Sequence, residues 1–129
     1  NELGVYTDPY QYFGRLQAEL WRAIRLVVDT GLHSKGWTRE QVIAYMKDNS
    51  ATNDTEAVSE TERYIAIPGQ ALAYKIGELK IKELRAKAEK ELGSQFDIRG
   101  FHAEVLKDGS VPLHVLEAKI DAWISSEKK

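Results

Sequence analysis

Polar side chains near two expected helix junctions are the best candidates for chemistry in this sequence. They are Arg25 and His33 near the first junction, and Arg63, Gln70 and Tyr74 near the second. An imidazole or a phenol can donate a hydrogen bond to a reacting oxygen, and a guanidinium suits a carboxylate because it offers two parallel donors. The grouping of these residues around positions 30–37 and 63–77 is a stronger indication of a site than any single residue.

Each of these residues also has an ordinary structural explanation. His33 follows an expected helix end, where a histidine can hydrogen-bond the last carbonyl groups. Tyr74 can equally pack as a half-buried tyrosine. Arg25 shares a helix face with Arg22 and Asp29, which permits either a solvated ion pair or a guanidinium fork held by Asp29 and directed at a carboxylate. The residues alone leave these alternatives open.

Metal and cysteine chemistry find no support in the sequence. The remaining histidines, His102 and His114, lie on later expected helices, and no histidine has a second histidine three or four residues away. There is no His-Glu-x-x-His motif and no cysteine. Three isolated histidines do not make a zinc site, so we expect neither a metal ion nor a cofactor to be held by this chain.

Length and charge narrow the class of protein. A chain of 129 residues corresponds to one domain, residues 1–129, or to a piece of a larger one. The net charge of -2, with 29% charged residues, gives no electrostatic footprint for nucleic acid. No apolar run approaches the length of a transmembrane helix.

Helical spacing of apolar residues predicts an all-α fold, an irregular bundle of about six helices. We expect helices over residues 8–30, 38–48, 55–66, 68–92, 97–108 and 112–124. Gly31 is the expected stop of the first helix, and Pro68 is the expected first residue of the fourth. The first helix should bury an apolar stripe. Its members are Phe13, Leu16, Leu20, Ile24, Val27 and Val28.

Four ordered stretches of the sequence are similar to one bacterial family. They are YTDPYQYFGRL at 6–16, LWRAIRLVVDTGLH at 20–33, KGWT at 35–38 and RYIAIPGQALAYKIG at 63–77. Together they resemble the bacterial domain-of-unknown-function family eight-eight-five. Its members look like gluzincin metallopeptidases, which are helical proteins several times longer than this chain.

The resemblance implies a role for this chain within such a protein. It would be the C-terminal portion, beginning just past the last zinc ligand, with the missing N-terminal portion supplying zinc. In related zincins a downstream tyrosine and histidine contact the substrate, which implies catalytic roles for Tyr74 and His33. Arg25, Arg63 and Gln70 would then bind the peptide substrate. The resemblance is compatible with an exported, periplasmic or lipid-anchored protein and does not choose among them.

A second class of function stays open beside this one. The chain could be a stand-alone helical module that presents a groove to a peptide or protein partner. A piece of a larger core should expose a contiguous apolar surface, whereas an independent module should not. For the first alternative we therefore also expect self-association through that surface.

Overall fold

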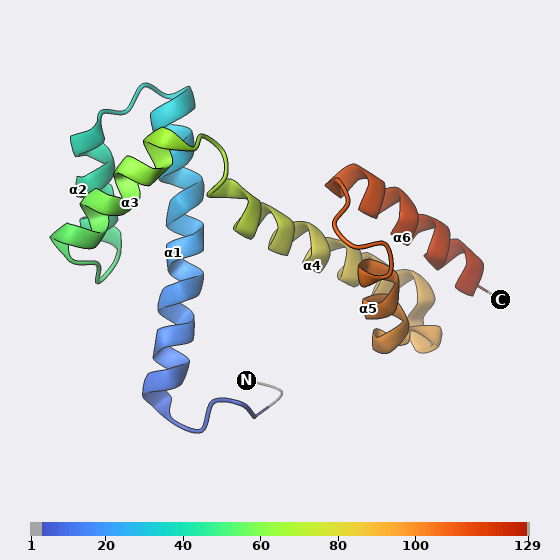
Figure 1. Ribbon diagram of the computed structural model, residues 1–129. Helices are drawn as coiled ribbons and strands as arrows, with labels where there is room; N and C mark the ends of the chain where they lie inside the picture. Colours follow the sequence, from blue (N-terminus) through green and yellow to red (C-terminus); the bar gives the residue numbers. More distant parts are fainter. Residues whose placement is uncertain (1–3, 129) are drawn as a thin grey trace. The chain divides into compact units, whose positions relative to one another are not determined.

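The computed structural model describes residues 4–128, and over this range the chain is helical without strands (Figure 1). The all-α prediction is therefore confirmed, as is the expected number of helices among the described residues. The helices are α1 (Pro9–Ser34), α2 (Arg39–Asn49), α3 (Asp54–Ala66), α4 (Leu72–Leu92), α5 (Ile98–Leu106) and α6 (Leu113–Glu127), with a 3-10 turn at Gly93–Gln95. None of the helices within the described range is long and apolar enough to cross a membrane.

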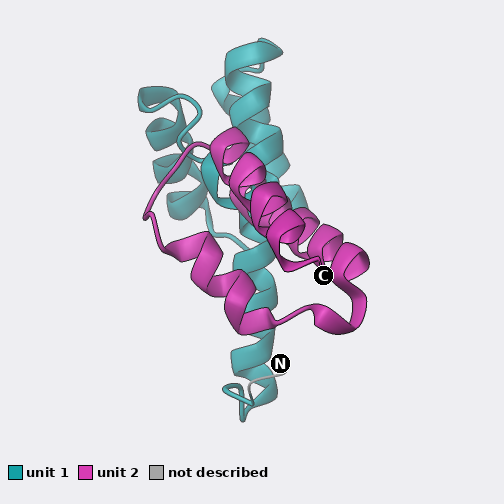
Figure 2. Ribbon diagram, turned by 90° about the vertical axis from the view of Figure 1, so that its right-hand side faces the viewer, with its two compact units in different colours: residues 1–75 teal, residues 76–129 magenta. Residues whose placement is uncertain are grey.

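The chain divides into two compact units, residues 1–75 and 76–129, each with its own core (Figure 2). The core of unit 1 consists of Ile24, Val28, Val42, Met46, Ala57, Tyr64 and Ala71. The core of unit 2 consists of Leu84, Ala88, Leu92, Phe101, Leu116, Ile120 and Ile124. The prediction that residues 1–129 act as one domain stays a prediction. All five candidate site residues fall in unit 1.

Helix starts in unit 1 follow from the residue types at their caps. The side chain of Asp8 accepts a hydrogen bond from the backbone of Tyr10 at 2.7 Å, with Pro9 in the first turn. Thr38 and Gln41 form the expected reciprocal capping box at the start of α2. These local bonds satisfy backbone N–H groups that have no partner inside the helix.

Gly31 does not end the first helix, contrary to the prediction. Helix α1 continues to Ser34, and the left-handed residue is Gly36, with φ of 67°. A Cβ built on Gly31 would meet the indole of Trp37 at 2.6 Å. The glycine is therefore required for close packing of Trp37, whose backbone N–H bonds to the Gly31 carbonyl at 2.9 Å.

We expect Gly31→Ala to destabilise the chain by about 1–3 kcal/mol, because the added methyl group collides with the Trp37 ring. The matched control is Gly14→Ala in the same helix, where nothing lies within 4 Å of an added Cβ. That change should stabilise the chain by about 0.5–1 kcal/mol through helix propensity. Urea unfolding of both variants measures the difference, and equal effects would show that Trp37 does not press on Gly31.

Pro68 likewise does not begin the fourth helix. Residues 67–71 form a turn in which Gly69 has φ of 79°, a left-handed conformation, and α4 begins at Leu72. The end of the preceding helix at Ala66 is as expected. The turn sets the position of Gln70 and of Tyr74 at the start of α4.

The apolar stripe predicted on the first helix is buried only in its second half. Ile24 and Val28 lie in the core, whereas Phe13, Leu16 and Leu20 are exposed, and so is Val27 in the second half. Within unit 1, α2 and α3 pack beside the second half of α1 and leave the first half uncovered (Figure 1). Self-association through this apolar surface stays a prediction.

Candidate functional site

One face of α1 carries four polar side chains at helical spacing. Arg22, Arg25, Asp29 and His33 recur at spacings of three and four residues, which places them on one face of a helix. Across from them lie the second half of α3 and the turn at 67–71, which the core of unit 1 holds in place. On this face Arg22 and Arg25 are partly buried and Asp29 is buried.

Glu60 of α3 is the centre of a charged network on this face. Its carboxylate accepts hydrogen bonds from Arg63 at 2.9 Å through both Nε and Nη2, from Tyr64 Oη at 2.7 Å, and from Arg25 Nη2 at 3.2 Å. Arg25 Nε also donates to Tyr64 Oη at 3.1 Å. Two guanidiniums and a phenol thus share one carboxylate, leaving the network with an excess positive charge.

The network shifts the pKa values of its members. Hydrogen bonds from Arg63, joined by those from Tyr64 and Arg25, lower the pKa of Glu60 from 4.5 to about 2 against the opposing effect of burial. Burial, joined by the hydrogen bond to Glu60, raises the pKa of Tyr64 to about 12. Near neutral pH Glu60 is therefore a carboxylate and Tyr64 a neutral phenol, and their role is to hold Arg25 and Arg63 in place.

Glu60→Gln should cost about 1–2 kcal/mol of stability at pH 7, after allowance for the partial exposure of the group. Because the folded pKa of Glu60 lies below 4.5, its contribution is present above about pH 4.5 and is lost as the pH falls toward about 2. The difference in unfolding free energy between wild type and variant should shrink over that window. Glu40→Gln, at an exposed position on α2, is the control. A difference that does not change with pH would contradict the assignment.

Tyr74 lies against two guanidiniums. Its ring centroid is 5.2 Å from Cζ of Arg25 and 5.7 Å from Cζ of Arg22, within the range of cation–π attraction. The side chain is 46% exposed, and within residues 4–128 its hydroxyl has no hydrogen-bond partner. The structure therefore brings Tyr74 and Arg25 together, with a phenol O–H available to an outside acceptor.

Within residues 4–128 Asp29 pairs with neither Arg22 nor Arg25, so the predicted solvated ion pair and the predicted guanidinium fork are both wrong. Its carboxylate, 2% exposed, accepts the backbone N–H of Gly69 at 3.0 and 3.1 Å. Arg25 is held by Glu60 and Tyr64 instead. Asp29 thus anchors the turn at 67–71, which leads into Tyr74.

The other three candidates come from three different segments, Arg63 from α3, Gln70 from the turn at 67–71 and His33 from the end of α1. Arg63 Nη1 donates to Gln70 Oε1 at 2.9 Å, so these two residues form a pair at the edge of the network. His33 Nε2 lies 2.9 Å from the carbonyl oxygen of Tyr64, on the last turns of α3. His33 is eight residues beyond Arg25, a separation of roughly 12 Å along a helix. The structure therefore does not bring His33 next to Tyr74.

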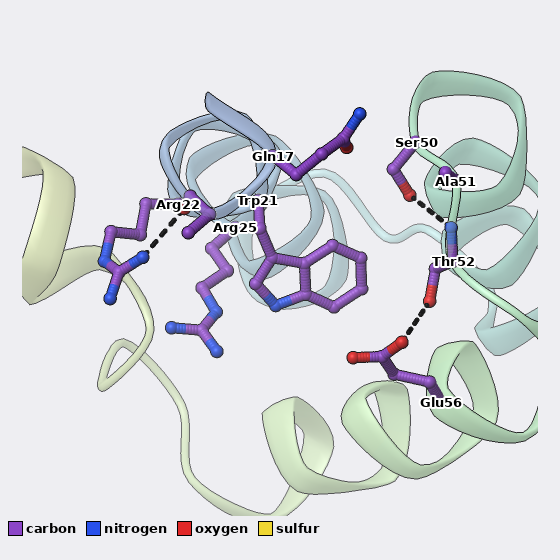
Figure 3. Close-up of a pocket in the computed structure, with 9 residues that line it drawn as sticks. Gln17, Trp21, Arg22, Arg25, Ser50, Ala51, Thr52 and Glu56 are labelled. Carbon is purple, nitrogen blue, oxygen red and sulfur yellow. Dashed lines mark hydrogen bonds between the residues drawn. The ribbon is translucent and has the colours of Figure 1, made fainter. Parts of the chain in front are cut away.

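The sequence did not single out Glu60 as a site residue, nor Trp21. The available signal for Glu60 was its spacing of three and four residues to Arg63 and Tyr64, which places all three on one helix face. Trp21 lines a pocket of about 410 Å³ (Figure 3). The other lining residues are Gln17, Ala18, Arg22, Arg25, Ser50, Ala51, Thr52 and Glu56.

Two comparisons with known proteins found matches, one to a family model and one to a solved structure. The family described as "Bacterial protein of unknown function (DUF885)" matches residues 1–120. A crystal structure described as a candidate lipoprotein from Colwellia psychrerythraea matches 97% of this chain at 54% sequence identity with a TM-score of 0.93. The match covers 22% of that protein's chain, so the present chain spans about a fifth of the length of this relative. No curated protein matches.

Proposed function

The chain belongs to the bacterial family of unknown function DUF885, and from this we propose that it forms the substrate-side, C-terminal lobe of a longer zinc-dependent peptidase. Two observations support the proposal. The stretches at 6–16, 20–33 and 63–77 resemble members that look like gluzincins. The match to about a fifth of a longer protein fits a lobe that works together with further residues.

The observation that carries the proposal is the exposed phenol of Tyr74 beside two guanidiniums. In amide hydrolysis the carbonyl oxygen gains negative charge in the transition state, and a fixed donor stabilises it. Tyr74 would supply that donor. Arg25, held from behind by Glu60 and Tyr64, would attract a peptide carboxylate without needing to reorganise.

The remaining candidates have supporting roles in this proposal. The pair Arg63–Gln70 lies at the edge of the network and would contact the peptide beside the reacting bond. The catalytic role of His33 stays a prediction. Its bond to the Tyr64 carbonyl supports a positioning role, because it fixes the end of the helix that carries Arg63 and Tyr64.

Zinc would be held outside the described residues. Among residues 4–128 no three His, Asp or Glu side chains are grouped as a metal site would require, so these residues do not fit the ion. A peptidase zinc polarises the substrate carbonyl and activates a water molecule, and no step assigned here passes through it. The candidate lipoprotein among the similar structures supports an exported or lipid-anchored location for the longer protein.

The proposal is tested by separating this chain from the longer protein. The purified chain of 129 residues should not hydrolyse peptides and should not bind zinc tightly. The gene that encodes it should contain His-Glu-x-x-His before these residues. Peptide hydrolysis by the purified chain would overturn the proposal, as would a gene without that motif.

A further inference from the structure

At one side of the Trp21 pocket, three side chains keep hydrogen-bond donors that no group within residues 4–128 accepts. Arg22 donates to the Ala18 carbonyl at 2.8 Å, and no carboxylate pairs with it in the part of the chain that the structure describes. Arg25 uses Nε and Nη2 in the Glu60 network, which leaves Nη1 unused within residues 4–128. The Trp21 indole N–H has no partner over the same range, and Figure 3 shows its nitrogen edge turned toward Arg25.

The opposite side of the pocket carries a negative charge. Figure 3 shows Arg22 and Arg25 on one side of the Trp21 indole and Glu56 on the other. Glu56 Oε2 accepts a hydrogen bond from Thr52 Oγ1 at 3.0 Å, which fixes the direction of the carboxylate. No cation pairs with Glu56 among the described residues. Within residues 4–128, Arg22 on one side of the Trp21 indole has no carboxylate partner and Glu56 on the other side has no cation partner, whereas Arg25 is paired with Glu60.

A ligand that complements this arrangement has a carboxylate at one end and an ammonium group at the other. A free amino acid carries both groups on one carbon and cannot place them on the two sides of an indole. An extended chain gains about 3.3–3.6 Å per residue, so a dipeptide is the shortest peptide that separates its charged ends in this way. The volume of about 410 Å³ lies within the usual range of small-molecule pockets, about 300–1,000 Å³.

We propose that this pocket binds short peptides whose two ends are both free, with the carboxylate at Arg22 and Arg25 and the ammonium group at Glu56. The inference rests on the proposed peptidase function and names its substrate class. Because Tyr74 lies against these same two guanidiniums, a peptide seated here has its carboxyl end near the Tyr74 phenol. Short peptides, and not internal loops of folded proteins, are then the substrates.

Calorimetric titration of the 129-residue chain with glycyl-L-phenylalanine tests this directly. Two blocked versions serve as comparison ligands, the N-acetylated dipeptide and the dipeptide amide. Each block removes one charge, so each should weaken binding about tenfold or more. Free L-phenylalanine should bind more weakly than the dipeptide. Equal affinities for the free and both blocked dipeptides, or no binding at all, would overturn the inference.

Two variants test which residue binds each end of the peptide, and a third is the control. Arg22→Gln should reduce the preference for the acid over the amide, since Arg25 remains, and Glu56→Gln should abolish the preference for the free over the acetylated amine. Arg15→Gln, a surface change on the same helix at a residue paired with Glu19, should leave both preferences intact. Circular dichroism checks that each variant is folded. An Arg22→Gln variant that prefers the acid as strongly as the wild type would overturn the assignment of the carboxylate end.

The outcome separates this inference from the proposed function. If the longer protein hydrolyses peptides but the chain shows no preference for free ends, only the pocket assignment fails. If the chain shows the preference but the longer protein hydrolyses no peptide, the peptidase function fails and the pocket remains a binding site.

Discussion

Tyr74→Phe in the longer protein is expected to lower kcat for peptide hydrolysis by about 10²–10³-fold, the usual effect of removing one oxyanion donor. The change deletes only the hydroxyl group, and the ring can keep its contact with Arg22 and Arg25. The phenol is exposed and has no partner within residues 4–128, so folding should be unaffected. KM should change little, since the hydrogen bond forms with the developing charge and not with the ground-state peptide.

Tyr10→Phe is the matched control for this measurement. Tyr10 is 84% exposed on the first turn of α1, and its loss of a hydroxyl should leave both kcat and KM unchanged. The two variants are compared at saturating peptide in the same assay. Equal kcat values for both variants would remove Tyr74 from the catalytic role and leave it as a packing partner of the arginines.

Asp29→Ala is expected to reduce the stability of the chain by about 2–3 kcal/mol, the largest loss that we predict for a polar residue. The carboxylate is 2% exposed and accepts the Gly69 N–H through both oxygens, so its removal leaves a buried donor without an acceptor. The turn at 67–71 loses its tie to α1. Faster hydrogen exchange of the Gly69 amide should accompany the loss measured by urea unfolding.

Two further variants make the Asp29 measurement specific. Asp29→Asn keeps one oxygen acceptor and should recover part of the lost free energy. Asp48→Ala, at an exposed position of α2, should change stability by no more than about 0.5 kcal/mol. If Asp29→Ala and Asp48→Ala have the same small effect, the bond to Gly69 does not hold the turn.

Local chemistry made the helix starts predictable. Asp8 before Pro9, and Thr38 three residues before Gln41, satisfy backbone groups with side chains that lie next to them in the sequence. The all-α class follows from the same kind of information, because helical periodicity is a local pattern.

Errors arose where a distant residue decides the local conformation. Glycine is the residue type expected where a helix ends, but Trp37 packs on Gly31 and the helix continues past it. Proline is the residue type expected where a helix begins, but Pro68 lies in the turn at 67–71. That turn is held by the hydrogen bond from Gly69 to Asp29, 40 residues away. Asp29 lies outside the sequence around Pro68, and the packing of Trp37 on Gly31 depends on how the loop after the helix folds back.

In the candidate site, too, the residue types were predictable from the sequence, whereas the contacts that depend on helix packing were not. Arg25 and Tyr74 were named from residue type and position, and the structure places them in contact. Their support by Glu60 could not be read from the sequence, because it depends on how α1 and α3 pack. For the same reason the sequence did not reveal that His33 faces the Tyr64 carbonyl instead of Tyr74.

The most direct test of the account is peptide hydrolysis by the longer protein before and after its metal is removed. The account predicts hydrolysis of short peptides that stops when a chelator removes the metal and returns when zinc is added back. Hydrolysis that continues at the same rate without metal would contradict it, and so would a zinc-loaded protein that hydrolyses no peptide.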